Sequence, residues 1–356
     1  MNDAITEQSI QHQLGKLTAL REAIAQVIVG QRDVVEQLLI GLLAGGHCLL
    51  EGVPGLGKTL LVRSLGQALA LDFRRIQFTP DLMPSDIVGT EILEEDHGTG
   101  KRYFKFQQGA VFTNLLLADE LNRTPPKTQS ALLEAMQERT ISYAGTTHVL
   151  PKPFFVLATQ NPLEQAGTYP LPEAQLDRFL LHIRVDYPDE VEERAILAQT
   201  TGGAAADITA VMGGEEVIAL QKLTREVHIG DDVLSWITRL VRASRPQGTA
   251  VQAVRDWVRW GAGPRAGQSL VLAAKAREEL VPQLALAVIA VSTATLMESA
   301  LAGYFPAPNC PQRRSLWAPA RPHRSESQLR QPLHPAERTK ASEPRSWFCP
   351  ACDARG

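Results

Sequence analysis

The segment from residue 52 to residue 59 carries the residue types that can hold a phosphate chain. It reads Gly52, Val53, Pro54, Gly55, Leu56, Gly57, Lys58 and Thr59, and Leu60 follows. This order matches the phosphate-loop pattern G-x-x-x-x-G-K-S/T at every fixed position. In that pattern backbone N–H groups face the anion, the lysine reaches the β- and γ-phosphates, and the hydroxyl ligates Mg²⁺. A glycine-rich turn that fits by chance is the alternative, but pattern and context together favour a nucleoside triphosphate site.

Two acidic residues, Asp119 and Glu120, follow the short apolar run Leu115–Ala118. Beyond a phosphate loop, hydrolysis of a nucleotide needs a group that holds the metal ion and a group that activates water. Asp119 is predicted to hold Mg²⁺, mostly through water, and Glu120 to polarise the attacking water. The alternative is a pair of exposed charges at a strand end, which the upstream phosphate loop disfavours.

Asn161 ends the next apolar run, which begins at Phe154, and Pro162 follows it. A polar amide at this place can orient a water molecule against the γ-phosphate. An asparagine that caps the turn before the proline is the alternative, and the residue taken alone favours that alternative.

A parallel sheet is expected to position these residues. Strands are predicted at residues 47–51, 72–78, 115–118 and 154–158. Helices are predicted at residues 5–28, 32–43 and 58–70, and another begins at Pro125 with Thr124 as its cap. Short strands that alternate with longer helices indicate an α/β domain, in which the carboxylates lie at the carboxyl end of the sheet beside the phosphate loop.

Three regions are expected along the chain. Residues 1–188 form the α/β nucleotide-binding core with an N-terminal helix, residues 189–276 a small helical domain that is incomplete, and residues 277–356 an atypical tail. The second region has helical periodicity and no strand-like runs. Residues 306–356 contain nine of the 23 prolines, and this composition buries too little surface to offset the entropy of ordering. Disorder is therefore predicted there.

Charge and cysteine content argue against a nucleic-acid-binding protein and against a secreted one. The chain has 356 residues and a net charge of −3, of which residues 311–356 contribute +5, so the remainder carries −8. A mildly acidic body gives no electrostatic case for nucleic acid as the main partner. The N-terminus has neither the basic nor the apolar segment of a signal peptide, and only Cys48 lies outside the last 50 or so residues. A reducing, cytoplasmic location fits this pattern.

The order of the motifs resembles an AAA+ ATPase, and more narrowly the MoxR-type family. The supporting segments are Val29–Gln31, Gly46–Thr59, Asp119–Arg123, Gln129–Met136, Gly167–Phe179 and Gly261–Ala266. Jointly these segments are highly specific, and departures such as Leu121, where isoleucine is commoner, are mild. The resemblance implies a P-loop NTPase with a parallel sheet flanked by helices, followed by a small all-α lid.

The resemblance also implies roles for residues to which the sequence pattern alone assigns none. The adenine pocket would be lined by Val29, Gly30 and Gln31. Asn161 would be the first sensor, and Arg178 an arginine finger that reaches the γ-phosphate of a neighbouring subunit. Arg265 would be the second sensor, carried by the lid. An ordinary ion pair for Arg178 and a helix N-terminal cation for Arg265 are the alternatives. Residues 80–112 would hold a pore-facing insertion in helix 2.

The resemblance implies an ATP hydrolase that uses ATP and Mg²⁺ and works as a homo-oligomeric ring, expected to be a hexamer. A finger that acts on a neighbour requires at least a dimer. The output would be chaperone-like remodelling or maturation of a client protein, with von Willebrand factor A domains among the implied partners. The alternatives are a nucleotide-binding assembly module with impaired hydrolysis, a chelatase-like motor subunit, and a DNA-translocating relative, which the acidic body disfavours.

The pattern changes abruptly after residue 276. We interpret the residues from there onward as a frame-shifted or aberrant end that replaces the last lid helices. The uncharged stretch Leu280–Met297 is long enough for a short membrane helix, but its proline and polar residues favour a buried or misfolded segment, and no stable span is expected. Cys349 and Cys352 lack a second ligand pair at zinc spacing, so no zinc site is predicted.

Overall fold

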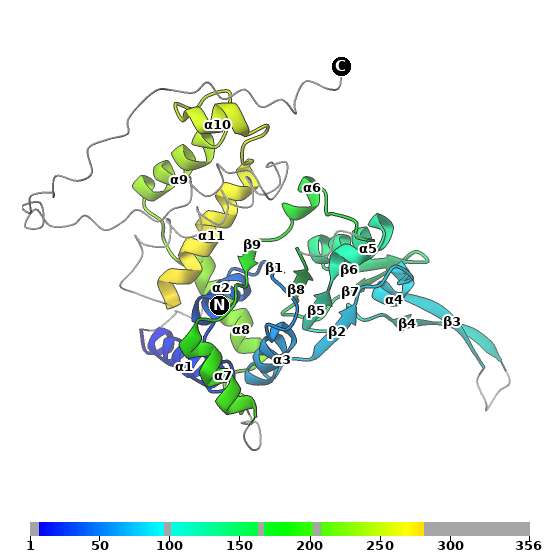
Figure 1. The fold of residues 1–356 in the computed structure, drawn as a ribbon. Coiled ribbons are helices and arrows are strands. Elements are labelled where there is room, and N and C mark those ends of the chain that lie inside the picture. The colour runs from blue at the N-terminus through cyan, green and yellow to red at the C-terminus, as the bar shows by residue number, and fades with distance from the viewer. Residues whose placement is uncertain (1–6, 96–100, 163–166, 202–207, 281–356) are drawn as a thin grey trace, which may run out of the picture. The chain divides into compact units, whose positions relative to one another are not determined.

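A five-stranded parallel sheet forms the centre of the α/β region in the computed structural model, which describes residues 7–95, 101–162, 167–201 and 208–280. The strand order is β2-β5-β8-β1-β9 (Figure 1). The strands are β1 (Cys48–Glu51), β2 (Phe73–Gln77), β5 (Leu115–Asp119), β8 (Phe155–Gln160) and β9 (Leu181–Arg184). All four predicted strands are confirmed to within two residues, and β9 has no predicted counterpart. The predicted α/β fold class is confirmed.

Both faces of the sheet are buried against helices. Successive side chains of a strand point to opposite faces, so Leu115 and Leu117 of β5 join one hydrophobic core, whereas Leu116 and Ala118 join the other. The first core contains residues of α1 (Glu7–Ala25), α2 (Arg32–Leu43) and α3 (Lys58–Ala68). Residues of α8 (Gly214–Glu226) and α11 (Pro264–Leu280) also join it. Helix α5 (Pro126–Glu138) contributes to the second. Burial on both faces explains why the strands are continuous apolar runs.

The predicted start of α5 is wrong by one residue, and Thr124 does not cap the helix. The helix begins at Pro126, and Pro125 has extended backbone angles (φ −58°, ψ 153°). A residue that precedes a proline is pushed out of the helical region by the proline ring, so Pro125 cannot be the first helical residue. The Thr124 hydroxyl instead donates to the carbonyl of Leu121, in the 3₁₀ turn η1 (Leu121–Arg123), at 3.2 Å.

His47 fixes the position of the first strand relative to its surroundings. Its Nδ1 accepts a hydrogen bond from the backbone N–H of Val156 at 3.0 Å, so the proton is on Nε2, which donates to the carbonyl of Met136 at 3.1 Å. The ring also meets Phe154 edge to face. Burial lowers the pKa of His47 to about 4, and the ring is therefore a neutral structural group at physiological pH.

Two hairpins extend the α/β region. Helix α4 (Pro84–Val88) leads into the antiparallel strands β3 (Gly89–Glu95) and β4 (Arg102–Gln108), which project away from the central sheet (Figure 1). Phe104 on this hairpin is 71% exposed. The second hairpin joins β6 (Thr140–Tyr143) to β7 (Thr146–Val149). Residues 80–112, where the resemblance implies an insertion, therefore contain a short helix and an exposed hairpin.

Among the described residues after β9, the regular elements are all helices and none is a strand, as predicted. The helices are α7 (Glu190–Thr200), α8 (Gly214–Glu226), α9 (Asp231–Ala243), α10 (Gln252–Trp257) and α11 (Pro264–Leu280). Helix α11 packs against α1, α2, α8 and α9, and its Arg277 pairs with Glu36 of α2 at 3.3 Å. Helix α11 continues four residues past position 276, where a boundary is predicted.

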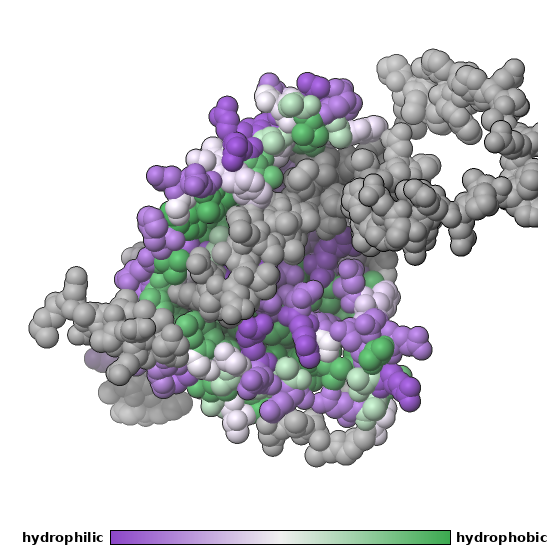
Figure 2. All heavy atoms as spheres, turned by 90° about the vertical axis from the view of Figure 1, so that its left-hand side faces the viewer, coloured by the Kyte–Doolittle hydropathy of each residue, from purple (hydrophilic) through white to green (hydrophobic). Residues whose placement is uncertain are grey.

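The helical region leaves apolar side chains at its surface. Val191 of α7 and Leu234 of α9 are exposed. Figure 2, which views the molecule from the left-hand side of Figure 1, shows hydrophobic patches among hydrophilic ones. Within the described ranges, no helix combines the length and apolar character needed to cross a bilayer. The predictions for the tail, from the apolar stretch after Leu280 to Cys349 and Cys352, lie outside the described residues.

Candidate active site

The phosphate-loop segment connects β1 to α3, and its backbone faces open space. Gly55 and Gly57 have left-handed φ angles of 88° and 70°, and a Cβ atom added to either would meet nothing within 4 Å. Helix α3 begins at Lys58 without a side-chain cap, so its first N–H groups are available to an anion. Gly52 is needed for a different reason, because a Cβ there would lie 2.5 Å from the carbonyl oxygen of Val185. The local geometry fits a phosphate chain.

Lys58 directs its amine along the same loop, where it donates to the carbonyl of Gly52. Partial burial lowers the pKa of Lys58, and the carboxylates of Asp119 and Glu120 act in the opposite direction. Lys58 is therefore partly withdrawn from water, and the neighbouring carboxylates favour its charged form.

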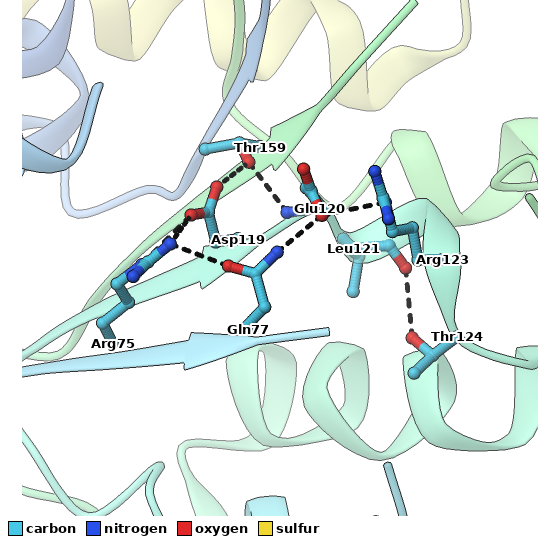
Figure 3. Close-up of polar contacts among 8 residues, drawn as sticks. All are labelled: Arg75, Gln77, Asp119, Glu120, Leu121, Arg123, Thr124 and Thr159. Atoms are coloured by element: carbon cyan, nitrogen blue, oxygen red, sulfur yellow. Dashed lines mark hydrogen bonds and ion pairs between the residues drawn. The ribbon is translucent and has the colours of Figure 1, made fainter. Parts of the chain in front are cut away.

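Asp119 ends β5 and has both carboxylate oxygens engaged (Figure 3). The Arg75 guanidinium donates to Oδ2 from Nε at 3.1 Å and from a terminal nitrogen at 2.7 Å. The Thr159 hydroxyl donates to Oδ1 at 2.6 Å. The Asp119 side chain is only 16% exposed, whereas that of Arg75 is 46% exposed. Asp119 is thus a well-fixed carboxylate whose present counter-ion comes from β2.

Glu120 adopts the left-handed backbone region, with φ 57°. Residues other than glycine rarely adopt this conformation, and it costs roughly 1 kcal/mol. The Glu120 N–H donates to the hydroxyl of Thr159 at 2.9 Å, which helps hold the turn. The Glu120 carboxylate accepts from Gln77 and pairs with Arg123 at 2.8 Å (Figure 3). The turn therefore directs the two successive carboxylates to different partners.

Asn161 lies at the same edge of the sheet as these groups. It follows β8 directly and is buried, at 6% exposure. The N–H of Gly52 donates to the carbonyl of Gln160 at 3.3 Å, so Asn161 is next to the start of the phosphate loop. Parallel strands end at one edge of a sheet. The structure thus brings together the phosphate loop, Asp119, Glu120 and Asn161.

The segment Val29–Gln31 between α1 and α2 also reaches the loop. The Gln31 side-chain amide donates to the carbonyl of Leu56 at 3.1 Å. Gly30 has a left-handed φ of 70°, and a Cβ there would collide with the carboxylate of Glu192 in the first turn of α7. The segment is therefore held between the phosphate loop and the helical region.

Arg178 and Arg265 lie together at the opposite edge of the sheet. Both line a cavity of about 210 Å³ that also includes Gly46. Gly46 precedes β1, whereas the phosphate loop follows it, so the two arginines do not meet the loop of their own chain. Arg178, between α6 (Glu173–Leu176) and β9, donates to the carbonyl of Leu133 at 2.8 Å. Among the described residues, no carboxylate forms an ion pair with Arg178, which does not support the ion-pair alternative.

Sequence reasoning missed four residues of the acidic end of the site: Arg75, Gln77, Arg123 and Thr159. Two of them lie on β2, whose register with β5 sets Gln77 beside Asp119. The missed signal was a pair of polar side chains at the carboxyl end of a predicted strand. Thr159 could have been recognised as the residue of β8 that comes two before Asn161.

Comparison with known proteins identifies the family. The family model described as "ATPase family associated with various cellular activities (AAA)" matches residues 47–181. "Chaperone MoxR1" of Mycobacterium tuberculosis is 43% identical over 75% of this chain and 71% of its own length. "Protein MoxR" of Paracoccus denitrificans is 32% identical over 75% of this chain and 84% of its own. The chain belongs to the MoxR-type AAA+ ATPase family.

A solved structure agrees with the MoxR-type assignment at the level of the fold. The crystal structure of a candidate ATPase from Cytophaga hutchinsonii superposes with a TM-score of 0.71 at 41% sequence identity. It covers 77% of this MoxR-type chain and 82% of the chain from Cytophaga.

The donor set of this MoxR-type chain fits magnesium better than a tightly bound transition metal. Among the described residues, no three His, Cys, Asp or Glu side chains cluster to hold a metal ion. Magnesium needs few protein ligands, because it keeps several waters and binds the phosphates of the nucleotide. Thr59, which is exposed at the start of α3, and Asp119 supply oxygen donors of that kind. The only cysteine described, Cys48, is buried, and its burial raises the pKa of the thiol.

Proposed function

We propose that this protein binds ATP at the phosphate loop and hydrolyses it at a site shared between subunits of a ring. One observation carries the proposal: the loop Gly52–Thr59, Asp119, Glu120 and Asn161 come from three different strand ends and meet at one edge of the sheet. The family assignment supports ATPase activity.

Each residue of the site has a distinct role in the proposed hydrolysis of ATP. Lys58 and the loop N–H groups would hold the phosphates. Thr59 and Asp119 would hold Mg²⁺, which would neutralise charge on the phosphates. Glu120 accepts the proton of the attacking water, and Asn161 orients that water. In this structure Gln77 and Arg123 occupy the Glu120 carboxylate. Glu120 must exchange these partners for water before it can act as a base.

The arginine pair supports a site between subunits. Arg178 and Arg265 lie at the edge away from the phosphate loop of their own chain, and they line a cavity together. Two cations at that edge are suited to stabilise charge on the γ-phosphate of a neighbouring subunit. A ring closes head to tail so that every loop meets such a pair. Six subunits is the ring size we propose.

The work done with ATP is, in this proposal, chaperone-like remodelling or maturation of a client protein in the cytoplasm. The relative from Mycobacterium tuberculosis is named as a chaperone, which supports this output. The exposed hairpin β3–β4, with Phe104 at its surface, is the surface through which a client would be engaged. Clients with von Willebrand factor A domains are the class to test first.

Substitution of Glu120 separates binding from turnover. We expect Glu120→Gln to bind ATP as the parent chain does but to release phosphate at least about 100-fold more slowly, because a base and its charge are lost. Glu215→Gln, an exposed change in the first turn of α8, is the matched control and keeps full turnover. If the parent chain binds ATP but releases no phosphate, it is a nucleotide-binding assembly module instead.

A further inference from the structure

We propose that a second, basic cavity on this protein is a binding site for a phosphate-sized oxyanion. The cavity has a volume of about 200 Å³. Four cationic side chains line it: Arg139 after α5, Lys152 before β8, and Lys222 and Arg225 on α8. We call it the basic cavity. No Asp or Glu of the described residues lines it.

The geometry around Gly45 shows how closely two of the cations approach. A Cβ built on Gly45 would lie 3.9 Å from a terminal guanidinium nitrogen of Arg139 and 3.9 Å from one of Arg225. The two nitrogens are therefore at most twice that distance apart. Charge-assisted N–H···O bonds to phosphate are about 2.8 Å long. One tetrahedral oxyanion can therefore bridge both guanidinium groups through two of its oxygens.

No carboxylate of the described residues neutralises these four cations. Across the described ranges, none of the four has a carboxylate within ion-pair distance. The adjacent acids Glu138 and Glu226 do not line the cavity. Partial burial lowers the pKa of Arg139, and the positive charge of Arg225 lowers it further. An oxyanion would relieve this repulsion.

Helix ends account for only part of the positive charge. Arg139 donates to the carbonyl of Gly45 at 2.8 Å, beyond the end of α2, and Arg225 lies in the last turn of α8. Cations are favoured at helix C-termini by about 0.3–1 kcal/mol. That preference does not explain Lys152, which lies in the loop before β8, or why four cations share one cavity.

The basic cavity is separate from the phosphate loop. Gly45 precedes β1 and Phe154 precedes β8, whereas the loop follows β1, so the two sites lie at opposite edges of the sheet. The oxyanion is therefore not a phosphate of the nucleotide at the loop of the same chain. Inorganic phosphate and the phosphate group of a larger molecule share the required chemistry.

Calorimetric titration of inorganic phosphate into the full-length chain tests the site. The titration uses the Lys58→Ala background, which weakens binding at the phosphate loop, and about 0.01 M salt, at which surface charges are little screened. We expect one phosphate per chain, and at least a tenfold loss of affinity when Lys222→Gln and Arg225→Gln are combined. Arg239→Gln, an exposed arginine of α9, is the control and leaves the affinity unchanged.

Thermal unfolding shows whether the variant with Lys222→Gln and Arg225→Gln still folds. Phosphate should raise the unfolding temperature of the Lys58→Ala chain. It should not raise that of the chain that also carries Lys222→Gln and Arg225→Gln. Without phosphate, both chains should unfold cooperatively. Phosphoserine, which has no adenine to bind at the nucleotide site, distinguishes the source when it replaces phosphate: binding at least as tight assigns the phosphate of a larger molecule, and weaker binding assigns the free anion. No phosphate binding, equal affinity in both chains, or tighter binding of acetate than of phosphate would overturn the proposal.

Discussion

Removal of Arg75 should make the site easier for Mg²⁺ to enter. Arg75 places two N–H groups on Oδ2 of Asp119, the carboxylate that we propose holds the metal ion. The guanidinium and the divalent cation therefore compete for one anion. Arg75→Gln removes the competing charge and leaves Oδ1 held by Thr159, so the carboxylate keeps its orientation.

The size of the effect follows from the exposure of the two side chains. Exposed ion pairs contribute about 0–1 kcal/mol, and burial of one partner raises that contribution. Arg75 is 46% exposed and Asp119 is 16% exposed, which sets the pair near the upper end of that range. A free energy of about 1 kcal/mol is a factor of about five in an equilibrium constant. We expect Arg75→Gln to lower the Mg²⁺ concentration for half-maximal nucleotide binding about fivefold.

A Mg²⁺ titration at fixed concentration of a fluorescent ATP analogue measures this shift. Arg74→Gln is the matched control, because Arg74 is the neighbouring exposed arginine of β2 and donates to the carbonyl of Gly109 rather than to a carboxylate. A higher Mg²⁺ requirement in Arg75→Gln would refute the competition and show that Arg75 positions Asp119. If both variants shift the required Mg²⁺ concentration equally, the cause is the change in net charge and not the contact with Asp119.

Three further outcomes are expected from single substitutions, all measured by chemical unfolding. Gly52→Ala should destabilise the fold by about 1–3 kcal/mol, because its Cβ would lie 2.5 Å from the carbonyl oxygen of Val185 and the backbone cannot yield cheaply. Thr159→Val should cost about 1–3 kcal/mol, because it leaves the Glu120 N–H without its acceptor; an unchanged midpoint would contradict this. The pKa of His47 is about 4 in the folded chain, against an ordinary value of 6.5. Its contribution to stability is therefore complete above pH 6.5 and falls as the pH drops toward 4, by about 2 kcal/mol at pH 5. His47→Gln should remove that component of the pH dependence.

The sequence predicted the parts of the site that are contiguous in the chain. The phosphate loop is one uninterrupted pattern, and Asp119, Glu120 and Asn161 each follow an apolar run directly. Such runs predict strands reliably here because both faces of the sheet are buried, so each strand is apolar throughout. Strand ends in a parallel sheet share an edge, and the convergence of these residues followed from that rule.

Residues that join the site through strand pairing or helix packing could not be predicted. Gln77 reaches Glu120 only because β2 pairs with β5 in one particular register. Arg178 and Arg265 share a cavity because the start of α11 lies near the end of the sheet at which the strands begin. Nothing in the local sequence encodes that position. The wrong start predicted for α5 is a local error, because Pro126 itself excludes a helical conformation for Pro125.

Complementation between two defective chains tests the shared site most directly. Lys58→Ala should be inactive because its own loop cannot hold phosphate, and Arg178→Ala because it cannot serve its neighbour. In a mixture, the loop of the Arg178→Ala chain is intact, and so is the arginine of the adjacent Lys58→Ala chain. If the site is shared between subunits, mixing the two chains restores steady-state phosphate release well above the sum of the separate chains. Release that never exceeds this sum, in mixtures shown to co-assemble, would contradict it.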